Sequence, residues 1–215
     1  MNNILILSVV RNCEYWIPQL KESIDKLQSS FPNYLFYHFL FENDSSDGTK
    51  DMIKKHFSYY DINEYNHADD KYMRSKRMAY YRNKSQQYLL RDFKRFSSYF
   101  EYIILLDSGT NIDEALLGPL LQTLTENTDI AMACPVPRVG AIVSDIHGVR
   151  RMPVLSDRIT DVSVCFDGIA VIKSNAFAES TWSVNHYCNS EHTNFCWGVR
   201  DTGRIVIDKK STFKK

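Results

Sequence analysis

Three short apolar runs in this sequence each end in polar residues of the kinds that bind phosphorylated ligands. In chain order these polar groups are Arg11-Asn12, Glu42-Asn43-Asp44 and Asp107-Ser108-Gly109. Carboxylate and amide oxygens accept hydrogen bonds from hydroxyl and N–H groups. Small residues let backbone N–H groups approach a ligand, and an acid can hold a divalent cation against phosphates. A single Asp after a strand is a common turn former, but three such ends together indicate a nucleotide site.

The pattern along the chain predicts an α/β fold that would bring these ends together. Strand-length apolar runs alternate with segments of helical periodicity, which is typical of a mainly parallel sheet flanked by helices. The predicted strands are Ile4–Val10, Leu35–Phe41, Asp61–Tyr65, Tyr102–Leu106, Asp129–Pro135, Val162–Ile172, which Asp167-Gly168 interrupts, and Arg204–Ile207. The predicted helices are Tyr15–Leu27, a helix capped by Ser45 or Ser46 that runs to about Phe57, Ser75–Phe96, Asn111–Leu124 and Glu191–Thr202. Ligands of such sheets bind beyond the carboxyl ends of the strands.

Charge and composition exclude some classes of partner. The formal net charge is zero, so no whole-protein field favours nucleic acid or an anionic membrane. Between Lys71 and Arg95 there are nine basic residues and one acid. That segment predicts either a local anionic ligand, such as a diphosphate, or a solvated helix face. No shift in composition marks a linker, so residues 1–215 are predicted to form a single domain, complete or cut from a longer enzyme.

Cysteine usage and hydropathy predict a cytoplasmic protein. The five cysteines are an odd number and widely spaced, which favours reduced thiols over a disulfide framework. The N-terminal segment lacks the basic region of a signal peptide, and no apolar run approaches the length of a membrane span.

The polar segment FENDSSDGT, at Phe41–Thr49, carries a resemblance to glycosyltransferases with the GT-A fold. It is especially similar to the cryptococcal-capsule α-1,3-mannosyltransferase family and to the amino-terminal glycosyltransferase domain of a chlorella-virus capsid-glycosylating protein. Further matches, in the same order, are VVRNCE, RMAYYRN, LLDSGT and SEHTNFCW, which spread from residue 9 to residue 197. The resemblance implies a Rossmann-like GT-A domain with a mixed, mainly parallel sheet.

The resemblance also implies donor-binding positions. Val10, Arg11 and Glu42 would line the nucleoside pocket, with Asp44 or Ser45 nearby, and Arg77 would meet the diphosphate or the base. Arg82 lies five residues further along the helix, about 140° around its axis, so it either contacts the ligand from another angle or pairs with a core acid. The remaining donor-binding candidates are Asn12, Ser108, Gly109 and Asp167. For Asp167 the alternatives are a hydroxyl contact and a β-bulge at an exposed edge.

Asp107 and Glu191 are the predicted catalytic residues. Asp107 matches the first acid of the Asp-x-Asp motif that holds Mn²⁺ or Mg²⁺ in this fold, but the second acid is absent here. A metal would therefore be held less strongly unless another group joins. Glu191 would be the general base if the transfer inverts the anomeric centre, and would position the acceptor if it retains it. His192 is a candidate metal or phosphate ligand.

Three other features yield weaker predictions. Asp69-Asp70 is a rival acidic pair, but a solvated loop is the simpler interpretation. His186, Cys188, His192 and Cys196 lack the spacing of a zinc finger or ribbon, so buried cysteines are favoured over a zinc site. The loop around Arg150-Arg151 is either a lid over the donor or a mobile surface loop.

The expected activity is transfer of a hexose or deoxyhexose from a UDP-sugar to a glycan or glycoprotein acceptor, with no nucleic acid partner. Resemblance to the viral domain favours glucose or rhamnose, capsid glycosylation and the host cytoplasm, whereas resemblance to the fungal family favours mannose. The alternative is a non-catalytic sugar-nucleotide-binding domain of a larger enzyme.

Overall fold

The structure is a computed structural model that describes residues 2–58, 60–63, 74–92, 96–137, 142–144, 157–184 and 191–213. Its centre is a sheet with the strand order β3-β2-β1-β4-β9-β5-β10-β7. The strands are β1 (Asn2–Val10), β2 (Tyr34–Asn43), β3 (Tyr60–Asn63), β4 (Tyr102–Leu106), β5 (Ile130–Pro135), β7 (Ile159–Val162), β9 (Ile169–Lys173) and β10 (Arg204–Asp208). Strands β6 (Ile142–Ser144) and β8 (Val164–Phe166) form a separate antiparallel ribbon.

The sheet is mixed but mainly parallel, as the sequence predicts. Strands β3, β2, β1 and β4 run parallel to one another, and β5 runs parallel to β10. Strand β9 runs antiparallel to both β4 and β5, between which it lies, and β7 is antiparallel to β10 at one edge. The carboxyl ends of β1, β2 and β4 therefore meet at one edge of the sheet, where Val10 pairs with Glu42.

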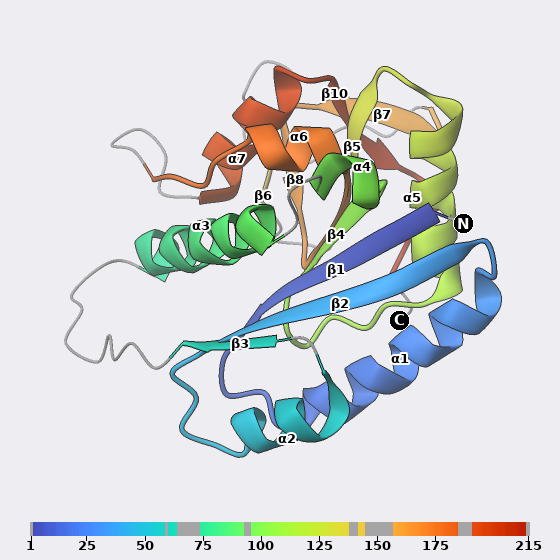
Figure 1. Cartoon of the computed structure of the whole chain (residues 1–215). Coiled ribbons are helices and arrows are strands. Elements are labelled where there is room, and N and C mark those ends of the chain that lie inside the picture. The colour runs from blue at the N-terminus through green and yellow to red at the C-terminus, as the bar shows by residue number, and fades with distance from the viewer. Residues whose placement is uncertain are drawn as a thin grey trace.

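Helices cover both faces of the sheet (Figure 1). They are α1 (Trp16–Ser30), α2 (Thr49–His56), α3 (Arg74–Asp92), α4 (Phe96–Tyr99), α5 (Glu114–Glu126), α6 (Ser174–Glu179) and α7 (Glu191–Arg200). Apolar residues of α1, α2 and α5 pack against one face, and those of α3, α4, α6 and α7 pack against the other. None of the helices in the described ranges is long and apolar enough to span a membrane.

The continuous apolar runs in β1 and β4 follow from this two-sided burial. In β1, Ile4 and Ile6 belong to the core on the α1 side, while Leu5 and Leu7 belong to the core on the α3 side. Because successive side chains of a strand point to opposite faces, a strand covered on both faces is apolar along most of its length. Ser8 of β1 is buried and lies within hydrogen-bond distance of His38.

The predicted strand Val162–Ile172, with its interruption at Asp167-Gly168, is observed as separate strands, divided at that interruption and after Val162. The chain leaves β7 at Val162, forms β8, turns at Asp167-Gly168 and re-enters the sheet as β9. Gly168 has a φ of 81°, in the left-handed region that glycine tolerates without steric cost. Apolar composition alone does not distinguish one long buried strand from two short ones joined by a tight turn.

The expectation that the cysteines are reduced was also wrong for one pair. Cys134 at the end of β5 and Cys165 in β8 form a disulfide, with their Cα atoms 6.3 Å apart. The fold brings the two cysteines together although they are 31 positions apart in the sequence. At such a separation, the spacing of cysteines does not predict which of them pair. Cys13 and Cys196 are buried free thiols, and Cys188 lies outside the described residues.

Candidate functional site

The loop after β1 and the loop after β2 are joined by hydrogen bonds between their backbones and side chains. The backbone N–H of Asn12 donates to Ser45 Oγ (2.9 Å), and the N–H of Ser46 donates to Asn12 Oδ1 (2.9 Å). One residue further, the N–H of Cys13 donates to Thr49 Oγ1 (2.8 Å). The predicted binding residues Asn12 and Ser45 thus fix the position of the two strand ends relative to each other.

Glu42 is fully buried beneath these loops. Its Oε1 accepts from the backbone N–H of Ser45 (2.7 Å), and its Oε2 has no hydrogen-bond partner among the described residues. Asp44 follows with a φ of 57°, a left-handed conformation that Asp tolerates better than most residues. The structure therefore buries Glu42 near the carboxyl end of β2 and places Asp44 in the turn that follows this strand.

A cavity of about 290 Å³ lies at the carboxyl ends of β1 and β4, covered by α3. Its lining includes residues from all three predicted strand ends and one predicted helix residue. Its lining residues are Val9, Val10, Arg11, Asn43, Arg74, Arg77, Met78, Tyr81, Asp107 and Ser108. The predicted residues Val10, Arg11, Arg77, Asp107 and Ser108 are brought together here, whereas Glu42, Ser45 and Gly109 do not line this cavity.

The sequence prediction assigned no binding role to four other lining residues, Val9, Arg74, Met78 and Tyr81. Arg74, Arg77, Met78 and Tyr81 follow the spacing i, i+3, i+4, i+7, which places them on one face of the helix. The sequence places Met78 and Tyr81 on one side of this helix, but a stripe of apolar and aromatic residues does not by itself indicate a cavity. Asn43, which also lines the cavity, belongs to the predicted polar strand end Glu42-Asn43-Asp44.

The cavity is rich in positive charge. Of its described lining residues, Arg11, Arg74 and Arg77 contribute three guanidinium groups, and Asp107 contributes one carboxylate. Tyr81 is buried beside them, and burial raises the pKa of its phenol to about 12, with Asp44 adding to the rise and Arg11 and Arg77 opposing it. Tyr81 is therefore a neutral hydrogen-bonding group at physiological pH.

Next to the cavity, Arg82 joins Asp107 to Glu191. Its Nη2 donates to Asp107 Oδ1 (2.9 Å) and its Nη1 donates to Glu191 Oε1 (3.0 Å). The side chains of Arg82 and Glu191 are 7% and 8% exposed, while that of Asp107 is 41% exposed. Of the two alternatives for Arg82, pairing with a core acid is the one observed, and the two predicted catalytic acids share its guanidinium.

His192 completes this cluster as a neutral imidazole. Its Nε2 lies 2.7 Å from Arg82 Nη1, and its ring stacks on Phe166 with 4.1 Å between centroids. Burial, and then the nearby charges of Arg82 and Arg74, hold the pKa of His192 well below its usual value. A neutral ring can accept the hydrogen bond from Arg82. Trp182 closes the cluster, with Arg82 4.8 Å from its ring centroid.

The turn between β8 and β9 borders the same carboxylate. The backbone N–H of Asp107 donates to the carbonyl oxygen of Gly168 (2.8 Å). Asp167 is therefore half-buried in a tight turn next to Asp107, rather than in a β-bulge at an exposed sheet edge.

The described residues do not form a complete site for a divalent cation. Asp107 is the single acid of the cavity lining, its Oδ1 is engaged by Arg82, and Ser108 and Gly109 follow where a second acid would stand. Within the described ranges, no three His, Cys, Asp or Glu side chains are grouped so that they could hold a metal ion. Asp69-Asp70, His186, Cys188 and Arg150-Arg151 lie outside the described residues.

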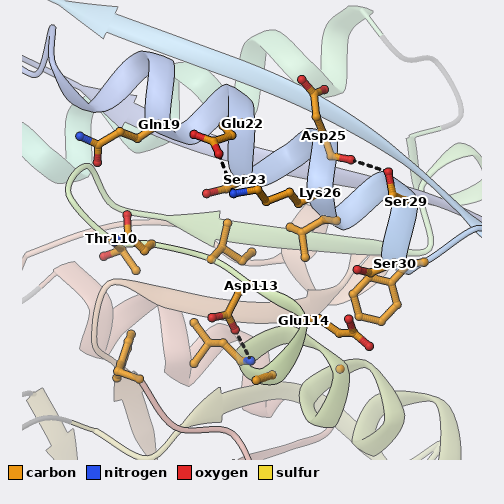
Figure 2. A pocket seen from close by; sticks show the side chains of 18 of the residues that line it. Gln19, Glu22, Ser23, Asp25, Lys26, Ser29, Ser30, Thr110, Asp113 and Glu114 are labelled. Carbon is orange, nitrogen blue, oxygen red and sulfur yellow. Dashed lines mark hydrogen bonds and ion pairs between the residues drawn. The ribbon is translucent and has the colours of Figure 1, made fainter. Parts of the chain in front are cut away.

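A larger hollow lies on the other face of the sheet, between α1 and α5 (Figure 2). It has a volume of about 1550 Å³ and borders Gly109. Its polar groups are largely satisfied within the helices: Lys26 pairs with Glu22, and Asp113 caps α5 by accepting from the N–H of Leu116. It includes neither the arginines of the cavity nor Asp107, so it is not the candidate site.

The comparisons with known proteins bear on the fold. No protein-family model matches the chain, and no curated protein sequence does. Among solved structures, it is similar to residues 1–349 of TarS from S. aureus, with a TM-score of 0.61, 14% identity, and coverage of 96% of this chain and 58% of that one. TarS 1–349 in complex with UDP-GlcNAc gives a TM-score of 0.59 at 14% identity, covering 96% and 56%.

A second group of similar structures is glucosyl-3-phosphoglycerate synthase from Mycobacterium tuberculosis. Its complex with Mn²⁺, UDP and glucosyl-3-phosphoglycerate gives a TM-score of 0.57 at 12% identity, covering 100% of this chain and 72% of that one. The chain has the GT-A fold. At these identities the likeness establishes the architecture alone, and the chain spans less than two-thirds of the TarS structures.

Proposed function

We propose that this protein is a glycosyltransferase that uses a UDP-sugar as donor and a glycan or glycoprotein as acceptor. The observation that carries the proposal is the arginine-rich cavity at the carboxyl ends of β1 and β4, at the edge where ligands of open α/β sheets bind. Support comes from the structures with the same fold, whose complexes contain UDP-GlcNAc or UDP.

In this proposal the nucleotide lies in the cavity, with Val10, Arg11 and Asp44 on the nucleoside side. Arg77 meets the diphosphate, because its guanidinium can donate two parallel hydrogen bonds to phosphate oxygens. Glu42 and Ser45 hold the loop that carries Asp44.

Asp107 and Glu191 are proposed to form the reaction centre. Arg82 holds both carboxylates, so the sugar would be positioned near Asp107 and the acceptor hydroxyl near Glu191. Glu191 takes up the proton of the attacking hydroxyl if the transfer inverts configuration, and orients the acceptor if it retains configuration. Asp167 lies in the turn beside Asp107 and is proposed to contact a sugar hydroxyl. The expected Mn²⁺ or Mg²⁺ at Asp107 stays a prediction, and no step is assigned to it.

Finer assignments follow the sequence resemblance. Glucose or rhamnose is the proposed sugar, and viral capsid glycosylation in the host cytoplasm is the proposed setting. We propose residues 1–215 as one GT-A domain, alone or within a longer enzyme.

A donor screen tests the proposal. Thermal unfolding would be followed with UDP, UDP-glucose, UDP-rhamnose, UDP-GlcNAc and GDP-mannose, each with Mn²⁺ and with chelator. A nucleotide at a hundred times its dissociation constant stabilises a protein by about 2.7 kcal/mol, or about 5–10 °C for a domain of this size. Stabilisation by the UDP compounds is expected, and no shift with any of them would refute the proposal.

The second candidate is a sugar-nucleotide-binding domain without transfer activity. The absent second acid and the engagement of Asp107 by Arg82 favour this alternative. This alternative would be supported if the protein binds UDP-sugars but releases no UDP, whether the acceptor is water or any member of a glycan panel.

A further inference from the structure

We propose that the diphosphate of the donor is neutralised by arginine side chains, so that nucleotide binding requires no divalent cation. This inference rests on the proposed function and concerns how the cavity recognises its ligand. It starts from the observation that the chain has the GT-A fold but lacks the second acid of the metal-binding motif found in it. The acidic motif that holds a metal in this fold is reduced to one carboxylate, while three arginines line the cavity.

The first observation is the charge of the lining. Among the described residues, Arg11, Arg74 and Arg77 line the cavity together with one carboxylate, that of Asp107, an excess of two positive charges. In the described part of the chain, none of these three arginines forms an ion pair with a carboxylate. Their donors are therefore available to a ligand that enters the cavity.

The second observation is that the one carboxylate already has a cation. Arg82 is buried, and its Nη2 donates to Asp107 Oδ1 at 2.9 Å. A second ion pair, with Glu191 at 3.0 Å, holds this buried guanidinium next to the cavity. Arg82 thus offsets the charge of Asp107, which would otherwise repel a phosphate.

The charges explain why a metal would be dispensable for binding. Two carboxylates at the strand end repel a diphosphate, and a divalent cation between them converts that repulsion into attraction. Here one carboxylate is offset by Arg82, and the remaining guanidinium groups attract the diphosphate directly. Arginine suits this task because its planar fork matches the geometry of phosphate oxygens and stays charged at every physiological pH.

Calorimetric titration with two probes tests the inference. UDP and inorganic pyrophosphate would each be titrated into the wild-type chain in EDTA and again in Mn²⁺. We expect UDP to bind in EDTA with an affinity within about threefold of that in Mn²⁺. Binding that appears only in Mn²⁺ would overturn the inference while leaving the proposed function intact.

Pyrophosphate separates the two claims. If pyrophosphate binds in EDTA and UDP does not, the arginine site stands and the proposed uridine nucleotide is wrong. If neither probe binds under any condition, both claims fail.

Charge removal locates the binding to the cavity. Arg77→Gln is expected to weaken binding of both probes in EDTA by about tenfold or more, because a charge-assisted hydrogen bond to phosphate is lost. The matched control is Lys84→Gln, which removes a cation from the same helix at a position that does not line the cavity. Equal affinities in Arg77→Gln, Lys84→Gln and wild type, with unchanged melting temperatures, would overturn the inference.

Discussion

Arg82 of α3 and Glu191 at the start of α7 form a buried ion pair, 3.0 Å between Nη1 and Oε1, although 109 residues separate them in sequence. The same guanidinium reaches Asp107 at the end of β4. The pair therefore ties one helix to another across the sheet end that carries the candidate reaction centre. Stability and activity should both depend on it.

Replacing Arg82 should destabilise the protein strongly. Arg82→Ala leaves Glu191 as a buried charge without its partner, which typically costs about 3–5 kcal/mol. Urea unfolding would measure the change. Arg91→Ala is the control, since Arg91 is exposed on the same helix and surface changes stay within about 0.5 kcal/mol. Equal losses for the two variants would contradict the assigned role.

Glu191→Gln tests the reaction centre with little change in shape. The amide can still accept a hydrogen bond from Arg82 but cannot take up a proton. If Glu191 is the base, sugar transfer should fall by about a hundredfold or more while UDP binding persists. UDP binding is measured by calorimetry and transfer by mass spectrometry of the acceptor. Transfer within threefold of wild type would remove Glu191 from the reaction centre.

The disulfide should contribute measurably to stability. A bridge that closes a loop of 31 residues restricts the unfolded chain by about 3–4 kcal/mol. Reductant should lower the free energy of unfolding of the wild type by about this amount. It should leave a Cys134→Ser, Cys165→Ser double variant unchanged. If the wild type shows free thiols at these positions by mass spectrometry and no response to reductant, the bridge is absent in solution.

His38 should make the protein less stable in mild acid. Burial lowers the pKa of His38 to about 3, below the usual value of 6.5 expected in the unfolded chain. The unfolded state therefore binds more protons, so the stabilisation present above pH 6.5 is lost as the pH falls toward 3. Between pH 6 and pH 5 the slope approaches 1.4 kcal/mol per pH unit from this residue. His38→Leu should have a shallower slope in urea unfolding, and an identical slope would contradict the assignment.

The sequence was sufficient to predict features that depend on local pattern. The buried strands at Ile4–Val10 and Tyr102–Leu106, and the mainly parallel sheet, are confirmed. So is the expectation that Arg77 and Arg82 point to different places, because helix periodicity alone separates them.

Features that depend on contacts between residues far apart in the sequence could not be predicted. The bond between Asn12 and Ser45 spans 33 residues, and it reveals that part of the FENDSSDGT motif serves to join two loops. The bridge between Cys134 and Cys165 and the insertion of β9 between β4 and β5 likewise follow from topology. No spacing rule connects residues so far apart in the chain.

Release of UDP from a UDP-sugar tests the central claim most directly. Wild type and Asp107→Ala would be incubated with UDP-glucose and UDP-rhamnose, with and without a glycan acceptor, and UDP would be quantified over time. The account predicts UDP release by the wild type and none by Asp107→Ala, with both proteins folded. Absence of UDP release from every UDP-sugar with the wild type, or equal release by the variant, would contradict it.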